Sequence, residues 1–144
     1  MDIYEILTSR RSIRKFKQTE IPIEILRKIV NTGRLAPSAG NLQPLEYFIA
    51  LDSSLREKVF ETLSWAKYIR PKGNPQKGEQ PMAYIIIIVN DEIANPDQFK
   101  YDVGASAENI IIAALTKGIG CCWIGSVNKK CLSKILQIPS NHSI

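Results

Sequence analysis

The chain has little of what hydrolytic and metal sites need. Its 144 residues include a single histidine, His142, so Ser-His-Asp and Cys-His arrangements lack a usable base. Its three cysteines, Cys121, Cys122 and Cys131, are odd in number, and none belongs to a CxxC pair with a second pair or histidines nearby. We therefore expect no hydrolytic triad, no structural disulfide and no zinc or other metal site. This cysteine usage also favours a reducing cytoplasm.

Long apolar runs are also lacking. The longest strongly apolar run covers residues 83–89, which is far too short to span a bilayer. The first five residues lack the basic region and following apolar region of a secretory signal. Hydrophobic residues make up 44% and charged residues 23% of the chain, which excludes the composition of a disordered protein. We expect a folded cytoplasmic protein that does not enter a membrane.

The charge that is present is mainly positive. A net charge of +5 suits an anionic partner, namely a nucleic acid, a phosphate-bearing cofactor or a membrane surface, and it equally suits a solvated basic surface. The basic residues are not interleaved with aromatic residues, and no helix-turn-helix, RNP-like or zinc pattern appears. A small nucleic-acid-binding protein is therefore an alternative class without a supporting motif, and we expect no nucleic-acid partner.

The spacing of apolar residues, caps and breakers predicts a single α+β domain over residues 1–144, without repeats or linkers. The expected elements are helices from Asp2 to near Ser9, from Pro22 to before Pro37, from Ser54 with Glu57 as a capping box, from Asp102 to about Lys117 and from Lys130 to Gln137, and strands over residues 45–51, 84–89 and 120–125. Residues 84–89 do not alternate, which suits a central strand covered on both faces. The small residues of the helix from Asp102 permit close approach of another backbone, in a core or across a dimer axis. The composition of residues 67–82 predicts a long loop, which is either a lid or a connection without a functional role.

Three segments have the residue types of a ligand site. Residues 10–14, Arg-Arg-Ser-Ile-Arg, can converge on a phosphate through charge-assisted hydrogen bonds, although basic clusters are more often solvated. Residues 37–44, Pro-Ser-Ala-Gly-Asn-Leu-Gln-Pro, offer uncharged polar groups and a glycine that lets backbone approach a planar ligand, but an ordinary helix-to-strand connection has the same composition. Residues 118–125 are rich in glycine without matching a dinucleotide or nucleoside triphosphate motif.

Taken together, the order and spacing of these segments resemble the nitroreductase family, over residues 1–139. The family shows an RRSxRxF opening, a PSxxNxQPW loop and a GxGxCWIG strand and turn, which correspond here to residues 10–16, 37–44 and 118–125. Residues 102–109 are similar to the family's central helix, with Glu108 where glutamine is common. Leu45 stands where the family often has tryptophan, and the chain stops at Ile144, before the family's basic C-terminal extension.

The resemblance implies an intertwined homodimer with FMN in two interfacial clefts, NAD(P)H as hydride donor, and a nitroaromatic, quinone or similar small molecule as electron acceptor. Arg10, Ser12 and Arg14 would contact the phosphate and ribityl groups, with Arg11 adding positive field or a direct contact. The flavin ring would be bordered by Pro37, Ser38, Asn41 and Gln43, partly from the partner subunit, and by Ile124 and Gly125 near N5.

Such an enzyme needs no catalytic side-chain acid or base, because the cofactor carries the redox chemistry. Cys121 and Cys122 are then better interpreted as small apolar residues than as redox centres. The alternative within the same family is a truncated member that binds FMN weakly without useful turnover.

Overall fold

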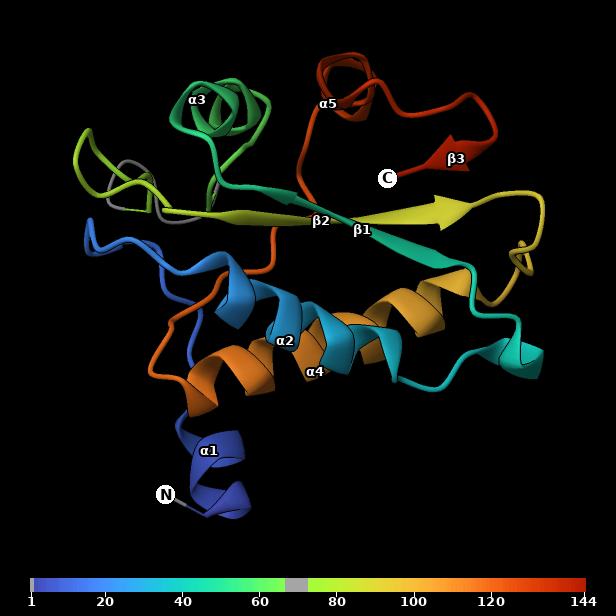
Figure 1. The fold of residues 1–144 in the computed structure, drawn as a ribbon, viewed down its shortest axis with the longest axis horizontal. Helices are drawn as coiled ribbons and strands as arrows, with labels where there is room; N and C mark the ends of the chain where they lie inside the picture. Colours follow the sequence, from blue (N-terminus) through green and yellow to red (C-terminus); the bar gives the residue numbers. More distant parts are fainter. Residues whose placement is uncertain (1, 67–72) are drawn as a thin grey trace.

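The computed structural model describes residues 2–66 and 73–144 and shows helices on both faces of a small antiparallel sheet (Figure 1). The elements in chain order are α1 (Ile3–Ser9), α2 (Ile23–Arg34), the short 3-10 helix η1 (Ala39–Asn41), β1 (Leu45–Ala50), α3 (Ser53–Glu61), β2 (Tyr84–Asn90), α4 (Phe99–Thr116), α5 (Lys129–Leu136) and β3 (His142–Ser143). The strands lie in the order β1-β2-β3, with α2 and α4 on one face and α3 and α5 on the other (Figure 1). This arrangement confirms the expected mixture of helices and sheet.

The central strand β2 is buried on both faces, as its unbroken apolar sequence predicted. Ile86 and Ile88 pack into a cluster that also contains Ala50, Val59 and Leu132, on the side of α3 and α5. The alternate side chains of β2 point the other way, toward α2 and α4, and Ile85 and Ile87 pack there against Ile29, Ile110 and Ala114. Alternate residues of a strand face opposite sides of a sheet, so an all-apolar strand requires two apolar layers.

Helices α2 and α4 pack closely because Gly33 has no side chain. A Cβ atom at Gly33 would lie 2.7 Å from the side chain of Ile110 and 2.9 Å from Oγ of Ser106. Ser106 is fully buried and its hydroxyl lies 2.8 Å from the hydroxyl of Tyr47 in β1. The glycine therefore permits the close approach of the two helices, and Ser106 of α4 reaches Tyr47 of β1.

Several helix ends follow from capping, and two differ from the sequence prediction. Asp2 and Glu5 form a reciprocal capping box at α1, confirming the first helix start. The predicted capping box of Ser54 and Glu57 is wrong, because Asp52 caps α3 and accepts the Leu55 N–H at 3.0 Å. Asp102 does not cap α4 either: the helix begins at Phe99, one turn earlier.

The C-terminal third also departs from the prediction. Residues 120–125 form no strand, because the backbone N–H of Ile13, in a loop, donates to this segment and no strand lies beside it within the described residues. The sequence predicts no strand after Gln137, but His142 pairs with Asn90 of β2 in the sheet, and its Nε2 lies 3.1 Å from Oε1 of Glu46. Within the described residues, no helix is long and apolar enough to cross a membrane.

Candidate functional site

The arginine-rich segment lies directly on the glycine-rich segment. The backbone N–H of Ile13 donates to the carbonyl oxygen of Cys121 at 2.9 Å. Beside this bond, a Cβ atom at Gly120 would lie 2.7 Å from the side chain of Ile13, so the close approach depends on glycine at that position. The structure thus brings together two of the three segments that the sequence singled out, residues 10–14 and 118–125.

The predicted phosphate-binding side chains differ in how they are held. The Nε atom of Arg10 lies 3.9 Å from Oε1 of Glu108 on α4. Arg11 instead donates from Nη1 to the carbonyl oxygens of Thr8 at 2.9 Å and Arg10 at 2.8 Å, which turns its guanidinium toward the end of α1. Ser12 is exposed and Arg14 half-buried. Within residues 2–66 and 73–144, Arg11 therefore has two backbone partners, whereas the ionic partner of Arg10 lies at the long distance of 3.9 Å.

The two cysteines next to this segment are protonated at neutral pH. Burial raises the pKa of Cys121 to about 11, with a smaller contribution from the charge of neighbouring Cys122. Burial also raises the pKa of Cys122, although the positive charge of Arg14 acts in the opposite direction. A nucleophilic or redox-active cysteine needs a lowered pKa. These environments support the interpretation of both residues as small apolar groups.

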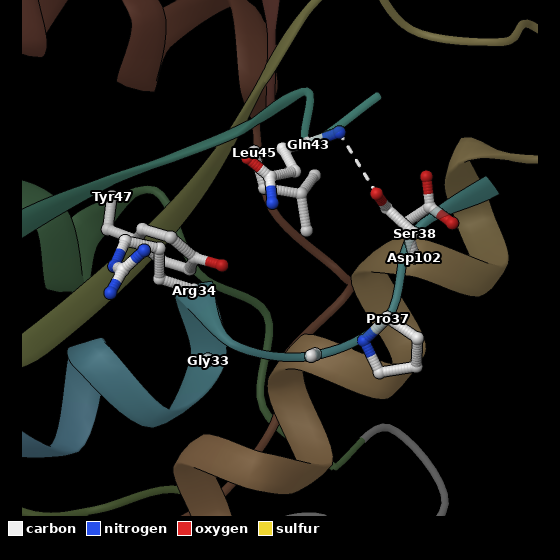
Figure 2. Close-up of a pocket in the computed structure, with 9 residues that line it drawn as sticks. Gly33, Arg34, Pro37, Ser38, Gln43, Leu45, Tyr47 and Asp102 are labelled. Atoms are coloured by element: carbon white, nitrogen blue, oxygen red, sulfur yellow. Dashed lines mark hydrogen bonds between the residues drawn. The ribbon is translucent and has the colours of Figure 1, made fainter. Parts of the chain in front are cut away.

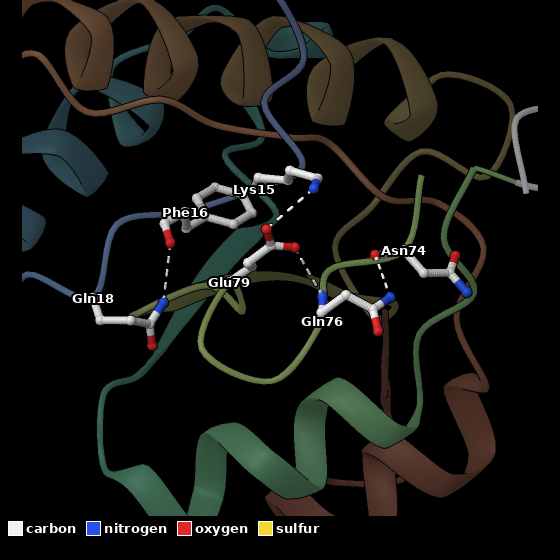
Figure 3. A network of polar contacts seen from close by, with 6 residues as sticks. All are labelled: Lys15, Phe16, Gln18, Asn74, Gln76 and Glu79. Carbon is white, nitrogen blue, oxygen red and sulfur yellow. Dashed lines mark hydrogen bonds and ion pairs between the residues drawn. The ribbon is translucent and has the colours of Figure 1, made fainter. Parts of the chain in front are cut away.

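Part of the predicted loop is tied to the chain just beyond Arg14 (Figure 3). The backbone N–H of Phe16 donates to the carbonyl oxygen of Glu79 at 2.9 Å. The carboxylate of Glu79 lies 3.1 Å from Nζ of Lys15. The hydrogen bond from Lys15 is the main cause of a lowered pKa at Glu79. Gln18 donates its side-chain N–H to the carbonyl oxygen of Gln80 at 3.0 Å. Residues 67–72 of that loop lie outside the described residues.

A separate pocket of about 210 Å³ lies between the loop after α2, β1 and the start of α4 (Figure 2). Its lining residues are Gly33, Arg34, Ala36, Pro37, Ser38, Gln43, Leu45, Tyr47 and Asp102. Three predicted site residues, Pro37, Ser38 and Gln43, are among them. The fourth, Asn41, is exposed, and its Oδ1 accepts the Gln43 side-chain N–H at 3.3 Å.

The pocket contains groups that the sequence reasoning missed. Burial raises the pKa of the Tyr47 hydroxyl, an effect partly opposed by its hydrogen bond with Ser106 and by the charge of Arg34. Strand alternation places Tyr47 on the same face of β1 as Leu45, which the family resemblance singles out, and this was the available signal for Tyr47. Arg34 and Asp102 had no comparable signal, because they come from separate helices that only the packing brings together.

Helix α4 separates this pocket from the arginine-rich segment. Asp102 and Ser106, one turn apart, face the pocket side, where Ser106 contacts Tyr47. Gly104 follows Asp102 by two residues, or about 200° around the helix, and so faces the opposite side. There the indole of Trp123 lies 4.0 Å from the Cβ position of Gly104.

The remaining predicted site residues lie on the Trp123 side of α4. Glu108, one turn beyond Gly104, meets Arg10 on that side. Half-buried Ile124 and exposed Gly125 follow Trp123 directly in the chain. Within one chain, the arginines and Ile124 and Gly125 therefore lie on one side of α4, and Pro37, Ser38 and Gln43 lie on the other.

Comparisons with known proteins show which family the chain belongs to. The chain is similar to an Archaeoglobus fulgidus protein whose name gives it as a candidate NADH dehydrogenase/NAD(P)H nitroreductase. The two sequences are 32% identical over 148 residues, which cover 95% of the chain and 77% of the relative. A nitroreductase family protein from Clostridium novyi has a TM-score of 0.84 and 26% identity, over 100% of this chain and 82% of that one. An FMN-dependent nitroreductase from Clostridium difficile has a TM-score of 0.80 and 28% identity, over 98% and 82%. A profile of the Nitroreductase family matches residues 7–144, and the chain therefore belongs to that family.

Proposed function

We propose that the protein is an FMN-dependent oxidoreductase that moves electrons from NAD(P)H to a nitroaromatic, quinone or similar small acceptor. Its family and relatives support an oxidoreductase in general. The observation that carries the finer proposal is the docking of residues 10–14 on Gly120 and Cys121, beside Ile124 and Gly125. This docking joins the cationic segment proposed for the phosphate to the backbone proposed for the reactive edge of the ring.

The chemistry of the arginine-rich segment fits a phosphate group. Arg10 and Arg14 carry guanidinium groups, which recognise phosphate oxygens through paired hydrogen bonds. The exposed hydroxyl of Ser12 lies between them in the chain. Among the residues that the structure describes, the ionic partner of Arg10 is Glu108 at 3.9 Å, and such a long contact leaves the guanidinium able to exchange that partner for a phosphate.

The chemistry of the pocket fits the edge of a planar, uncharged ring system. Ser38 and Gln43 supply neutral polar groups, and Pro37 and Leu45 supply apolar surface. However, a volume of about 210 Å³ is below the roughly 300–1,000 Å³ that ligand sites usually occupy. The pocket and the arginines also lie on opposite sides of α4. We infer that each complete site combines the arginines of one subunit with the pocket loop of another, in a homodimer.

The pocket and the arginines act on the cofactor by position and by charge. FMN, when bound, supplies hydride acceptance from NAD(P)H and electron transfer to the acceptor. The arginines hold its phosphate, while the pocket loop and residues 124–125 orient the ring and exclude water. No proton transfer by a side chain is required.

Spectroscopy tests the proposal directly. Purified protein is mixed with FMN, its flavin absorption band is recorded, and NADH or NADPH is added without oxygen. We expect a protein-bound flavin band that bleaches and that returns on addition of a quinone. A bound band that does not bleach would indicate a flavin-binding protein without turnover, and the absence of a bound band would exclude both functions.

Sedimentation tests the dimer. We expect a dimer at micromolar concentration in the presence of FMN. A monomer that retains the flavin would refute a site built from two subunits.

A further inference from the structure

A buried carboxylate holds the pocket loop from a distant part of the chain. Oδ1 of Asp102 accepts the backbone N–H of Ala39 at 2.9 Å, across 63 positions of sequence. Asp102 is only 5% exposed and lies in the first turn of α4, where the helix dipole favours a negative charge. A hydrogen bond from a neutral amide to a carboxylate is stronger than one between neutral groups. The contact is therefore a firm tether on the loop.

The loop needs such a tether because its backbone is unusual. Gly40, Asn41 and Gln43 all have positive φ angles, of 58°, 56° and 53°. Apart from asparagine, residues other than glycine rarely adopt this left-handed region, so Gln43 is the unfavourable position of the three. A second bond closes the loop locally, since Oγ of Ser38 accepts the Gln43 N–H at 2.9 Å. Among the hydrogen bonds of the described residues, the one from Ala39 to Asp102 ties this closed loop to α4.

From these contacts we propose that Asp102 is a positioning residue for flavin. By holding Ala39, it keeps the loop in the shape that presents Ser38, Asn41 and Gln43 to the ring. This inference rests on the proposed function. Asp102 also lines the pocket with Ser38 and Gln43, so loss of its carboxylate changes the shape of the site as well as the loop (Figure 2).

The tether has a distinctive consequence for ligand affinity. The loop is assigned to the ring, which FMN and riboflavin share, whereas the arginines are assigned to the phosphate, which riboflavin lacks. Loss of the tether lowers the population of the competent loop and so weakens both flavins by the same factor, about tenfold to a hundredfold for one charge-assisted bond. Loss of an arginine instead weakens FMN selectively.

Four variants of the full chain test the tether. Asp102→Ala removes the acceptor, and Asp102→Asn keeps a carbonyl oxygen that can accept the same N–H. Ala39→Pro removes the donor without touching the buried carboxylate; it suits the first position of η1, and extended Ser38 (φ −130°, ψ 153°) has the backbone that precedes proline. Asp97→Asn is the matched control, because it removes an exposed carboxylate just before α4.

Two measurements are made on each variant. Hydrogen exchange of the amides of residues 39–43 is followed without flavin, and the dissociation constants of FMN and riboflavin are measured by fluorescence. We expect faster loop exchange in Asp102→Ala, equal weakening of both flavins in Asp102→Ala and Ala39→Pro, recovery of most affinity in Asp102→Asn, and no change in Asp97→Asn. If Asp102→Ala fails to fold, Ala39→Pro decides the question alone.

The outcomes separate the two proposals. Unchanged loop exchange, or unchanged flavin affinity in Ala39→Pro, would overturn the positioning role while the wild-type flavin band still supported the proposed function. Weakening confined to FMN would also overturn it, since that result belongs to a phosphate contact. Wild-type protein that binds neither flavin would overturn the proposed function and, with it, any role of Asp102 toward flavin, whatever the exchange data showed.

Discussion

Ile13 and Cys121 join the two segments of the proposed phosphate site through one backbone hydrogen bond of 2.9 Å. Next to this bond the Ile13 side chain lies across Gly120, in space that a Cβ atom would fill. The segment that carries the arginines is thereby placed on residues 118–125 through the backbone and side chain of Ile13. The position of the charge is therefore sensitive to a change at Gly120, which carries no charge.

We expect Gly120→Ala to detach the arginine-rich segment. The added methyl group would lie 2.7 Å from the side chain of Ile13, which is 38% exposed and so can move outward. The free energy of unfolding should fall by about 1 kcal/mol, the low end for overpacking, and FMN affinity should fall with it. Gly104→Ala is the control for which we expect the opposite result. Its free energy of unfolding should rise by about 1 kcal/mol, because alanine is more favourable than glycine in a helix interior. Urea denaturation of both variants tests the pair, and equal effects would contradict the assignment.

The three arginines should differ in their effect on FMN. Arg10→Ala and Arg14→Ala each remove a charge-assisted contact, so FMN should bind about tenfold to somewhat over a hundredfold more weakly, with little change for riboflavin. Arg11→Ala should cost less, because the Arg11 guanidinium is bonded to the carbonyl oxygens of Thr8 and Arg10. Titration of both flavins measures the ratio. Equal weakening of FMN and riboflavin by Arg10→Ala would argue against a phosphate contact.

The elements with strong local signals were predictable from the sequence, and those defined by distant partners were not. The apolar run of β2 and the capping box of Asp2 and Glu5 encode their structure within a few residues. Residues 120–125 look like a strand locally, but a strand also needs a neighbour with a continuous ladder, and their partner at Ile13 is a loop. The pairing of His142 with Asn90 likewise depends on a segment about fifty positions away.

The candidate site was predictable as a set of segments but not as an arrangement. The sequence identified Ser38 and Arg10, and the family resemblance assigned both to one cofactor. Within one chain, α4 lies between Ser38 and Arg10. This arrangement depends on how α4 packs on α2, which is set in part by the contact of Gly33 with Ser106 and Ile110. The role of Asp102 was likewise not predictable from its position. The sequence suggests a helix cap, whereas in the structure its carboxylate accepts the backbone N–H of Ala39 in the loop.

Glu108 should weaken FMN binding, because its carboxylate competes with phosphate for Arg10 at 3.9 Å. Both side chains are partly exposed, so Glu108→Gln should gain less than about 1 kcal/mol, or up to about fivefold in FMN affinity. Riboflavin affinity should not change, and the gain should shrink as salt is raised. Glu24→Gln removes the same charge on α2, away from the site, and serves as the control. A gain of equal size in both variants would mean that net charge alone is responsible.

The last prediction concerns the stability of the fold at high pH. Burial raises the pKa of Cys121 from an ordinary 9.0 to about 11. A folded-state pKa above the unfolded one means that the folded protein holds this proton more tightly. The stabilising contribution is therefore complete below about pH 9 and is lost as the pH rises to about 11. Two pKa units correspond to at most about 2.7 kcal/mol.

Urea denaturation at steps from about pH 7 to about pH 11 measures this loss. The variant Cys121→Ala has no thiol at this position, so its free energy of unfolding should fall less steeply than that of the wild-type protein above pH 9. The raised pKa of Tyr47 and Tyr84 affects both proteins alike and cancels in the difference. Cys131→Ala, which removes an exposed thiol, should follow the wild-type curve. If the curves of Cys121→Ala and wild-type protein run parallel to about pH 11, the Cys121 thiol is not held protonated by its burial beside Ile13.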